Sequence, residues 1–126
     1  MKQLDEAEKF LRLAAQDEKV LKLLKDTDAS DAAWGFHAQQ AAEKTLKSVL
    51  VLLGVSFPKT HDLALLYQLV MQQPVPPIPA TLDELDQLDP FAVEFRYDES
   101  IEVSLDRAQV LDLIIKLKHW ASSQLK

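Results

Sequence analysis

The sequence predicts an all-α fold, an up-and-down antiparallel bundle of four or five helices. Its 126 residues include only two glycines, and no Asn-Gly or Asp-Gly pair offers the turn that a tight hairpin needs. Leu, Ala, Glu, Gln and Lys, which favour helices, are abundant. Apolar residues recur every three or four positions, the period of one helix face. The connections between these segments are short, which favours antiparallel neighbours.

The first two predicted helices span residues 3–25 and 31–53. Ser30 is a good N-cap for the second helix, and Gly54 is suited to end it in the left-handed conformation. The first helix has one apolar stripe with charged residues opposite it, and we expect that stripe to face the core. The stripe consists of Leu4, Ala7, Leu11, Ala14, Leu21 and Leu24.

The second helix has a broad core face and a polar face opposite to it. At about 100° per residue, the core face gathers Trp34, Ala38, Ala41, Ala42, Thr45, Val49, Leu52 and Leu53. The polar face gathers Gln40, Glu43, Lys44 and Lys47. Phe36 lies in the middle of that polar face. A large aromatic ring does not fit a solvated surface, so we expect this face to meet either another part of the fold or a second chain.

The next elements are shorter and are separated by prolines. We expect a third helix over residues 61–73, capped by Thr60 or Asp62, with Leu63, Leu66 and Val70 turned inward. Residues 74–79, Pro-Val-Pro-Pro-Ile-Pro, cannot be helical and are interpreted as a rigid connector. The alternative is a ligand for a domain that binds polyproline II helices.

The last part of the chain predicts two more helices. Thr81 and Glu84 form a capping box that opens a fourth helix, with a kink or break expected at Pro90. We expect this helix to run through Leu85, Leu88, Ala92 and Phe95. Residues 97–103 are interpreted as a loop, because a lone strand has no partner in a helical chain. Ser104 then caps a helix over residues 105–125, and one face of it holds Ala108, Leu111, Ile115, Lys118 and Ala121.

Composition and charge exclude several classes of protein. We expect one domain over residues 1–126, a length that supports a single core. The absence of cysteine excludes disulfides and thiolate metal sites. Because neither glycine has a glycine neighbour, Walker and Rossmann phosphate loops are excluded as well. A net charge of −6 does not attract nucleic acid globally. With no long apolar run and a charged N-terminus, we expect a cytoplasmic protein without a membrane partner.

Two histidines are candidate functional residues, and each has a structural alternative. His37 is either a proton-transfer or nucleotide-contacting group, or a half-buried residue that donates to a neighbouring helix. The position four residues after it is Ala41 rather than a His or a carboxylate, so we predict no metal site. His61 and Asp62 either cap and anchor the third helix or bind a ligand.

The charged residues of the second helix also allow two interpretations. Glu43, Lys44 and Lys47 have the spacing of ion pairs on a solvated helix face. With Phe36 in the same stripe they also fit an interface, because aromatic anchors are typical of binding hot spots. The aromatic residues Trp34, Tyr67, Tyr97 and Trp120 are not interleaved with basic residues, so we interpret them as core or interface residues rather than base-stacking platforms.

One segment of the sequence resembles the signature of HEPN domains. It reads Phe-His-Ala-Gln-Gln-Ala-Ala-Glu-Lys-Thr-Leu-Lys at residues 36–47, and Gly54, Pro58 and Thr-His-Asp-Leu at residues 60–63 follow it. The resemblance implies an up-and-down helical bundle that commonly dimerises. It also implies a partner, because many members of the family are encoded beside, or fused to, a minimal nucleotidyltransferase in toxin–antitoxin-like pairs.

The resemblance extends to Arg96 and Tyr97, since many relatives carry Arg-Tyr-Pro near the start of the last helix; here Asp98 replaces the proline. Several HEPN branches are metal-independent ribonucleases, which pair an Arg with a His four to six residues later. That Arg would stabilise phosphate charge and the His would act as general acid and base. No His follows Arg96, Arg107 or Arg12 at this spacing. We therefore expect binding rather than catalysis.

The resemblance thus implies that this chain is a nucleotide- and/or partner-binding member of a toxin–antitoxin-like pair with a minimal nucleotidyltransferase. We also expect this chain to form a homodimer. RNA is the less favoured ligand, and a nucleotide is the one candidate cofactor. The candidate binding residues are Phe36, His37, Gln40, Glu43, Lys44, Lys47, His61, Asp62, Arg96 and Tyr97. One alternative is a ribonuclease with a non-standard site that uses Arg96 with His37 or His61. The other is a non-catalytic helical module that only homodimerises.

Overall fold

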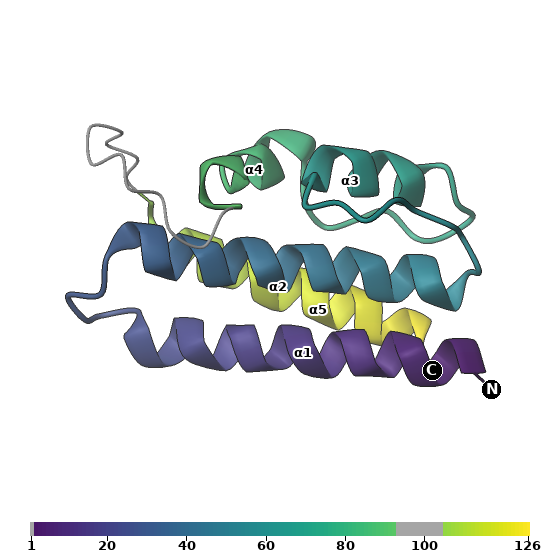
Figure 1. Ribbon diagram of the computed structural model, residues 1–126, viewed down its shortest axis with the longest axis horizontal. Helices are drawn as coiled ribbons and strands as arrows, with labels where there is room; N and C mark the ends of the chain where they lie inside the picture. The colour runs from purple at the N-terminus through teal and green to yellow at the C-terminus, as the bar shows by residue number, and fades with distance from the viewer. Residues whose placement is uncertain (1, 93–104) are drawn as a thin grey trace.

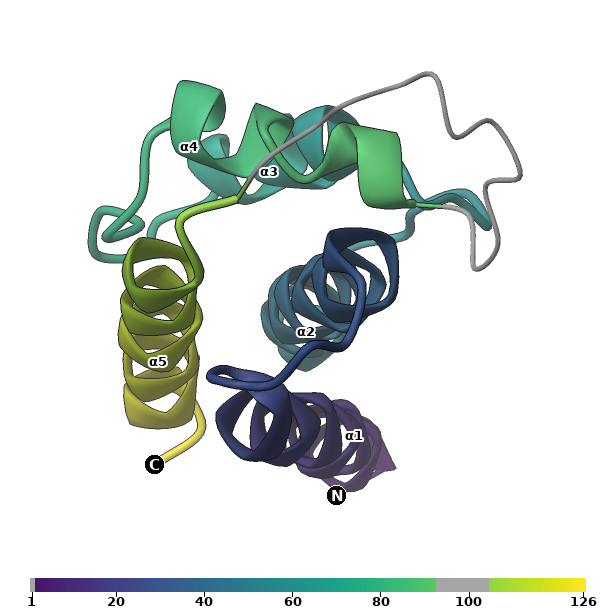
Figure 2. The ribbon, with the colours of Figure 1, turned by 90° about the vertical axis from the view of Figure 1, so that its left-hand side faces the viewer.

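The computed structural model describes residues 2–92 and 105–126, and this part of the chain forms an all-α bundle, as predicted. Its elements are α1 (Lys2–Leu24), α2 (Asp31–Leu52), α3 (Leu63–Met71), α4 (Leu82–Asp86), the 3-10 helix η1 (Asp89–Phe91) and α5 (Arg107–Gln124). The long helices α1, α2 and α5 lie side by side, and α3 and α4 lie over α2 and α5 (Figure 1 and Figure 2). Both α2 and α5 run antiparallel to α1 (Figure 1).

The boundaries of α2 follow from its two caps. Ser30 accepts a hydrogen bond from the Ala33 amide at 3.1 Å, as an N-cap does. At the other end Gly54 has a φ of +71°, and the Val55 amide donates to the Leu50 carbonyl at 2.9 Å. This is a Schellman motif, which favours glycine because a side chain is strained in the left-handed region. Both predicted caps are confirmed, and the helix ends one residue earlier than expected.

The core lies where the apolar faces of the helices meet. In α1 the predicted stripe contributes Ala7, Ala14 and Leu21 as its most deeply buried members. Trp34 of α2 is also fully buried, and its indole Nε1 donates to the Leu21 carbonyl at 3.0 Å. A buried indole nitrogen needs such a partner, so Trp34 joins the two helices by packing and by a hydrogen bond. Among the described residues, no helix combines the length and apolar character that crossing a membrane requires.

The layer of α3 and α4 begins at the caps that the sequence predicts. Asp62 caps α3 by accepting from the Leu65 amide at 3.3 Å. Thr81 and Glu84 form the reciprocal capping box of α4. The connector between these helices lies against α5, because the Trp120 indole donates to the Pro76 carbonyl at 3.0 Å. The inward residues of α3 are Leu63, Leu66 and Val70, all fully buried as predicted.

Two boundaries in the second half of the chain differ from the predicted ones. The fourth helix ends at Asp86, so the break expected at Pro90 comes four residues earlier, and Pro90 lies inside η1. Phe95, the last residue expected in this helix, lies outside the described residues. The ring of a proline clashes with the carbonyl four residues earlier, here that of Asp86, so the α-helix stops there. The last helix is capped by Asp106, which accepts from the Gln109 amide at 3.1 Å, and not by Ser104.

The buried face of α5 also differs from the predicted one. Of the residues that the sequence groups on one face, Leu111 and Ala121 are buried, whereas Ala108 is exposed. The buried residues are Val110, Leu111, Leu113, Ile114, Leu117, Trp120 and Ala121. This face is wider than a single stripe, because α5 meets both the long helices and the layer above them (Figure 2). The second contact widens the apolar surface beyond the stripe expected for one partner.

Arg107 holds the start of α5 against the α1–α2 connection. Its Nη1 donates to the Leu24 carbonyl at 2.9 Å, and its Nη2 donates to the Ala29 carbonyl and, at 2.9 Å, to the Asp31 carboxylate. The guanidinium also stacks over the Trp34 ring, with Cζ 5.6 Å from the ring centroid. A planar group with five donors is suited to bridge several acceptors at once. Arg107 therefore has a structural role.

Glu18 joins α1 to α5 in the interior. The residue is 4% exposed, and its Oε2 accepts from Lys118 of α5 and from Lys22 of α1, both at 3.0 Å. Its Oε1 has no hydrogen-bond partner among the described residues. Burial raises the pKa of this carboxyl, but the hydrogen bonds and charges of Lys118 and Lys22 together lower it further, and its pKa lies below the usual value.

We predict that Gly35→Ala destabilises the fold, although alanine is the better helix former by about 1 kcal/mol. A Cβ on Gly35 would lie 2.5 Å from Cγ of the Phe91 ring, far inside van der Waals contact. The ring of η1 would have to move, and overpacking of this kind costs about 1–3 kcal/mol. Urea unfolding measures the change in the free energy of unfolding.

The matched experiment repeats Gly35→Ala in a Phe91→Ala background. Without the ring the substitution should become neutral or stabilising, so the double-mutant cycle should give a coupling of about 1 kcal/mol or more. A Gly35→Ala protein as stable as wild type would contradict the close contact.

We predict that Glu18 makes the fold sensitive to acid. Because its pKa is lowered by folding, the unfolded chain binds more protons than the folded chain once the pH falls below the ordinary value of 4.5. The stability that Glu18 contributes is fully present above that value and is lost as the pH falls through the lowered pKa. Urea unfolding from pH 5 to pH 3 should show a shallower loss of stability in Glu18→Gln than in wild type. Equal slopes would contradict the prediction.

Candidate functional site

A buried carboxylate of α1 organises the first part of the candidate site. Asp17 is 7% exposed, and its two oxygens bind two different residues of α2. Its Oδ1 lies 2.9 Å from His37 Nδ1, and its Oδ2 accepts from Lys44 Nζ at 2.8 Å. His37 is thus a half-buried residue that donates to a neighbouring helix, one of the two interpretations that the sequence allows.

This contact fixes which nitrogen of His37 carries a proton. A carboxylate only accepts hydrogen bonds, so Nδ1 must be the donor. The neutral ring then has Nε2 as an acceptor, and the same nitrogen becomes a donor when the ring is protonated. No described residue binds Nε2 of His37, and a third of the side chain is exposed. The Phe36 ring packs edge-on against the imidazole, with centroids 5.5 Å apart.

A second buried carboxylate repeats the arrangement farther along α2. Glu43 is 4% exposed; its Oε1 lies 2.8 Å from His61 Nδ1, and its Oε2 accepts from Lys47 Nζ at 3.0 Å. The chain after α2 doubles back to place His61 here, beside the middle of the helix (Figure 1). Glu43 is therefore not part of a solvated helix face, which excludes that interpretation of the stripe. Lys47 also lies 5.8 Å from the Phe57 ring centroid.

Two glutamines extend the second carboxylate cluster toward the first. The fully buried Gln39 donates through Nε2 to Glu43 Oε1 at 3.2 Å and to the His61 carbonyl at 3.0 Å. Gln40 donates to Gln39 Oε1 at 2.8 Å, and it lies between His37 and Lys44 on the same face of α2. We call the residues of both clusters the polar stripe: Asp17, His37, Gln39, Gln40, Glu43, Lys44, Lys47 and His61.

The other predicted site residues lie apart from these contacts or outside the described residues. Asp62 caps α3 and is not bound to the polar stripe. Arg96 and Tyr97 belong to residues 93–104, outside the described part of the chain. On the neighbouring surface of α1, a hollow of about 240 Å³ is lined by Glu6, Lys9, Phe10 and Leu13. Phe10 and Leu13 are half-exposed, as Phe36 is.

Asp17 and Gln39 are the residues of the polar stripe that the sequence interpretation missed. The sequence does carry a signal for Glu18, the residue next to Asp17. Apolar residues at positions 7, 11, 14 and 21 recur every three or four residues, and Glu18 occupies the position where this repeat expects another apolar residue. A carboxylate on the core stripe predicts a buried charge that needs a partner. For Asp17 and Gln39 we find no comparable local signal.

The polar stripe presents hydrogen-bonding groups whose conformations are already fixed. Each histidine is held through Nδ1 by a carboxylate that also binds a lysine. Fixing side chains before a ligand arrives reduces the entropy lost on binding. Chemically, imidazole and ammonium groups can donate to a phosphate or carboxylate, and an imidazole can also transfer a proton.

Comparison with known proteins gives one match. The family model described as "HEPN domain" matches residues 3–120 of the chain, which include the whole polar stripe. No match was found among the curated proteins or the solved structures.

We predict that Asp17→Asn lowers the free energy of unfolding by about 1–3 kcal/mol, because it removes the carboxylate that compensates a partly buried lysine. Urea unfolding measures this. Glu8→Gln is the control, since Glu8 is exposed on the same helix and should change stability by less than about 0.5 kcal/mol.

Nitrogen NMR of the His37 ring gives a second readout. In wild type the neutral ring should carry its proton on Nδ1, and Asp17→Asn should increase the population protonated on Nε2. A ring whose tautomer does not respond would contradict the assigned hydrogen bond.

Proposed function

The chain belongs to the HEPN domain family, and from this premise we propose that it is a binding protein whose partner is a minimal nucleotidyltransferase. It acts as one member of a toxin–antitoxin-like pair and uses the polar stripe of α2 to bind that partner, with or without a nucleotide. The observation that carries the proposal is the pair of buried carboxylates, each of which fixes one histidine and one lysine.

The construction of the polar stripe supports binding. Its carboxylates are nearly inaccessible, whereas Lys44 and His61 keep 23% and 66% of their side chains exposed. A ligand that approaches this face meets imidazole and ammonium groups first. These groups suit the phosphates of a nucleotide or the acidic side chains of a protein.

The apolar residues beside the stripe suit a protein partner. Phe36 packs against His37, and Phe10 and Leu13 line the hollow on α1. Partly exposed aromatic residues beside polar groups fit an interface, because aromatic residues are enriched there and often act as binding hot spots. A homodimer is part of the proposal as well, and in a two-fold dimer one surface of the chain meets its own copy.

The arginines of the described residues support binding over catalysis. Arg107 is bound to Asp31 and to backbone carbonyls, so its guanidinium is occupied structurally. Arg12 is exposed on α1 and makes no ion pair with a described residue. Neither arginine has the His spacing of the ribonuclease branches.

Isothermal titration tests the proposal with ATP and with the nucleotidyltransferase encoded by a neighbouring gene. Wild type should bind at least one of them, and Lys44→Gln should weaken binding about tenfold by removing one charge-assisted hydrogen bond. The matched control is Lys19→Gln, which removes the same charge from an exposed position of α1 and should leave affinity unchanged. A wild-type protein that binds neither ligand would overturn the proposal.

A ribonuclease is the second candidate, and one observation favours it. His37 and His61 are both oriented through Nδ1 by a carboxylate and both lie in a cluster with a lysine. Acid–base cleavage of RNA through the 2′-hydroxyl needs oriented proton-transfer groups and a cation for the phosphate. Incubation with RNA in the presence of a chelator decides this: cleavage lost in His37→Ala or Arg96→Ala supports the enzyme, and an inert wild type excludes it.

A further inference from the structure

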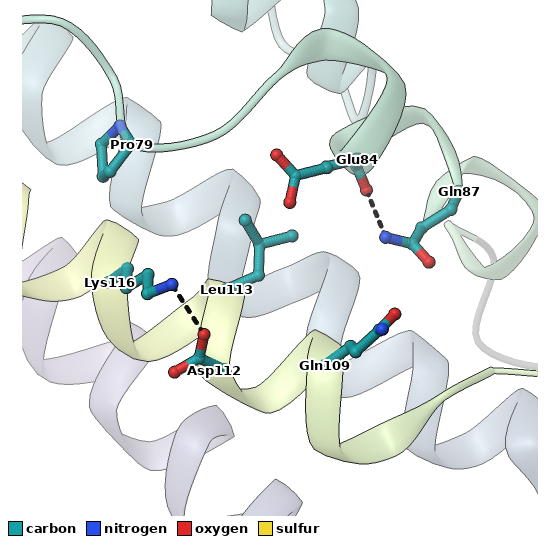
Figure 3. Close-up of a pocket in the computed structure, with 7 residues that line it drawn as sticks. All are labelled: Pro79, Glu84, Gln87, Gln109, Asp112, Leu113 and Lys116. Atoms are coloured by element: carbon teal, nitrogen blue, oxygen red, sulfur yellow. Dashed lines mark hydrogen bonds and ion pairs between the residues drawn. The ribbon is translucent and has the colours of Figure 1, made fainter.

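A second hollow lies on a different part of the molecule, between α4 and α5. Its volume is about 330 Å³, near the lower end of the range for small-molecule sites. Glu84 and Gln87 form one wall, and Gln109, Asp112 and Lys116 form the other, as Figure 3 shows. The buried Leu113 lies between the walls, and Pro79 closes one end.

The two carboxylates of this hollow each have one occupied oxygen. Glu84 Oε1 accepts from the Thr81 amide at 2.9 Å and from its hydroxyl at 3.2 Å, as part of the capping box. Asp112 Oδ2 pairs with Lys116 at 2.8 Å. Within the described residues, no donor binds Glu84 Oε2 or Asp112 Oδ1. One acceptor oxygen on each wall is thus available to a ligand.

The glutamines add further acceptor capacity. Gln87 donates its Nε2 to the Glu84 carbonyl at 2.8 Å, which leaves its Oε1 for a ligand (Figure 3). The side chain of Gln109 has no hydrogen bond with any described residue, and it lies on the opposite wall. Acceptors therefore outnumber donors, and Lys116 is the one cation among the lining residues.

The surrounding charge favours a cation. The segment 81–92 contains four acidic residues and no basic residue. Burial, and after it the negative charges of Asp86 and Asp62, raise the pKa of Asp89 in this segment. The hydrogen bond and charge of Asp112 raise the pKa of Lys116, and the charge of Glu84 on the opposite wall raises it as well. Carboxylates of both walls therefore stabilise a positive charge at this place.

We propose that the α4–α5 hollow binds a guanidinium group. A guanidinium is planar and offers five donors in a fork, so it can bridge carboxylate oxygens on two walls and reach the glutamine oxygens as well. Its flat face can rest on Leu113. The group comes either from free arginine or from an arginine side chain of a protein partner. Lys116 is the internal cation that occupies Asp112 when the ligand is absent.

NMR titration of the full chain tests the proposal, with Leu113 methyl and Gln109 amide signals as reporters. The probes are L-arginine, the neutral isostere L-citrulline, and a blocked Gly-Arg-Gly tripeptide. We expect affinity on the order of millimolar for arginine, because the hollow is open and the ligand small. Citrulline should bind at least tenfold more weakly. Tighter binding of the tripeptide than of arginine identifies a protein side chain as the source, and the reverse identifies the free molecule.

One substitution in a wall of the hollow and a matched control outside it sharpen the test. Glu84→Gln keeps the capping box, which accepts glutamine at this position, and should weaken arginine binding roughly three- to tenfold. The matched control is Asp83→Asn, which removes the same charge from an exposed neighbour outside the hollow and should change affinity less than about twofold. An equal effect of both variants would mean unspecific attraction and would overturn the proposal.

Lys116→Gln should strengthen binding, whereas Glu84→Gln should weaken it. Without the competing lysine, Asp112 is free to bind the guanidinium, so tripeptide affinity should rise roughly two- to fivefold, which corresponds to the free energy of one exposed ion pair. Unchanged Leu113 and Gln109 signals up to roughly 50 mM arginine would overturn the proposal, as would equal binding of arginine and citrulline. The hollow shares no residue with the polar stripe, so these outcomes do not depend on whether the proposed function holds.

Discussion

Two adjacent buried carboxylates of α1 constrain how the three long helices meet. Asp17 and Glu18 point about 100° apart around the helix, and they therefore face different neighbours. Asp17 binds His37 and Lys44 of α2, and Glu18 binds Lys118 of α5. A buried charge that loses its partner costs several kcal/mol. If α1 slid or rotated against either helix, one of these two buried carboxylates would therefore lose its partner. Apolar packing supplies most of the attraction between the helices, and these contacts select one register.

The same constraint connects the fold to the candidate site. Asp17 and Glu43 are part of the interior, yet each fixes a histidine and a lysine that reach the surface. The buried Gln39 links the helix to the returning chain at His61. Side chains held this way lose little freedom when a ligand binds. Under the proposed function, stability and partner binding depend on the same residues, so we expect substitutions in the polar stripe to change both.

Local signals predicted most of the elements correctly. Ser30, Asp62, the Thr81–Glu84 box and Gly54 act where the sequence places them, because a cap depends on residues within a few positions. The start of α5 was wrong although Ser104 and Asp106 are both good caps. In the structure Asp106 is the cap, and the adjacent Arg107 reaches Leu24 and Asp31, a distant contact that a local capping signal does not contain. The early end of α4 reflects Pro90, whose effect extends back over the preceding turn.

The sequence by itself determined the helical class, the apolar faces of α1 and α3, most of the core face of α2, and the segment that resembles HEPN domains. Leu53, which the sequence places on that core face, is exposed. His37, Lys44, Glu43 and His61 are all among the candidate residues that the sequence gives. Only the tertiary structure decided which charges are buried and what they bind. Asp17 is twenty residues from His37, and Glu43 is eighteen from His61. Periodicity describes one helix at a time, whereas these pairs form between segments whose contact depends on the packing of the whole bundle.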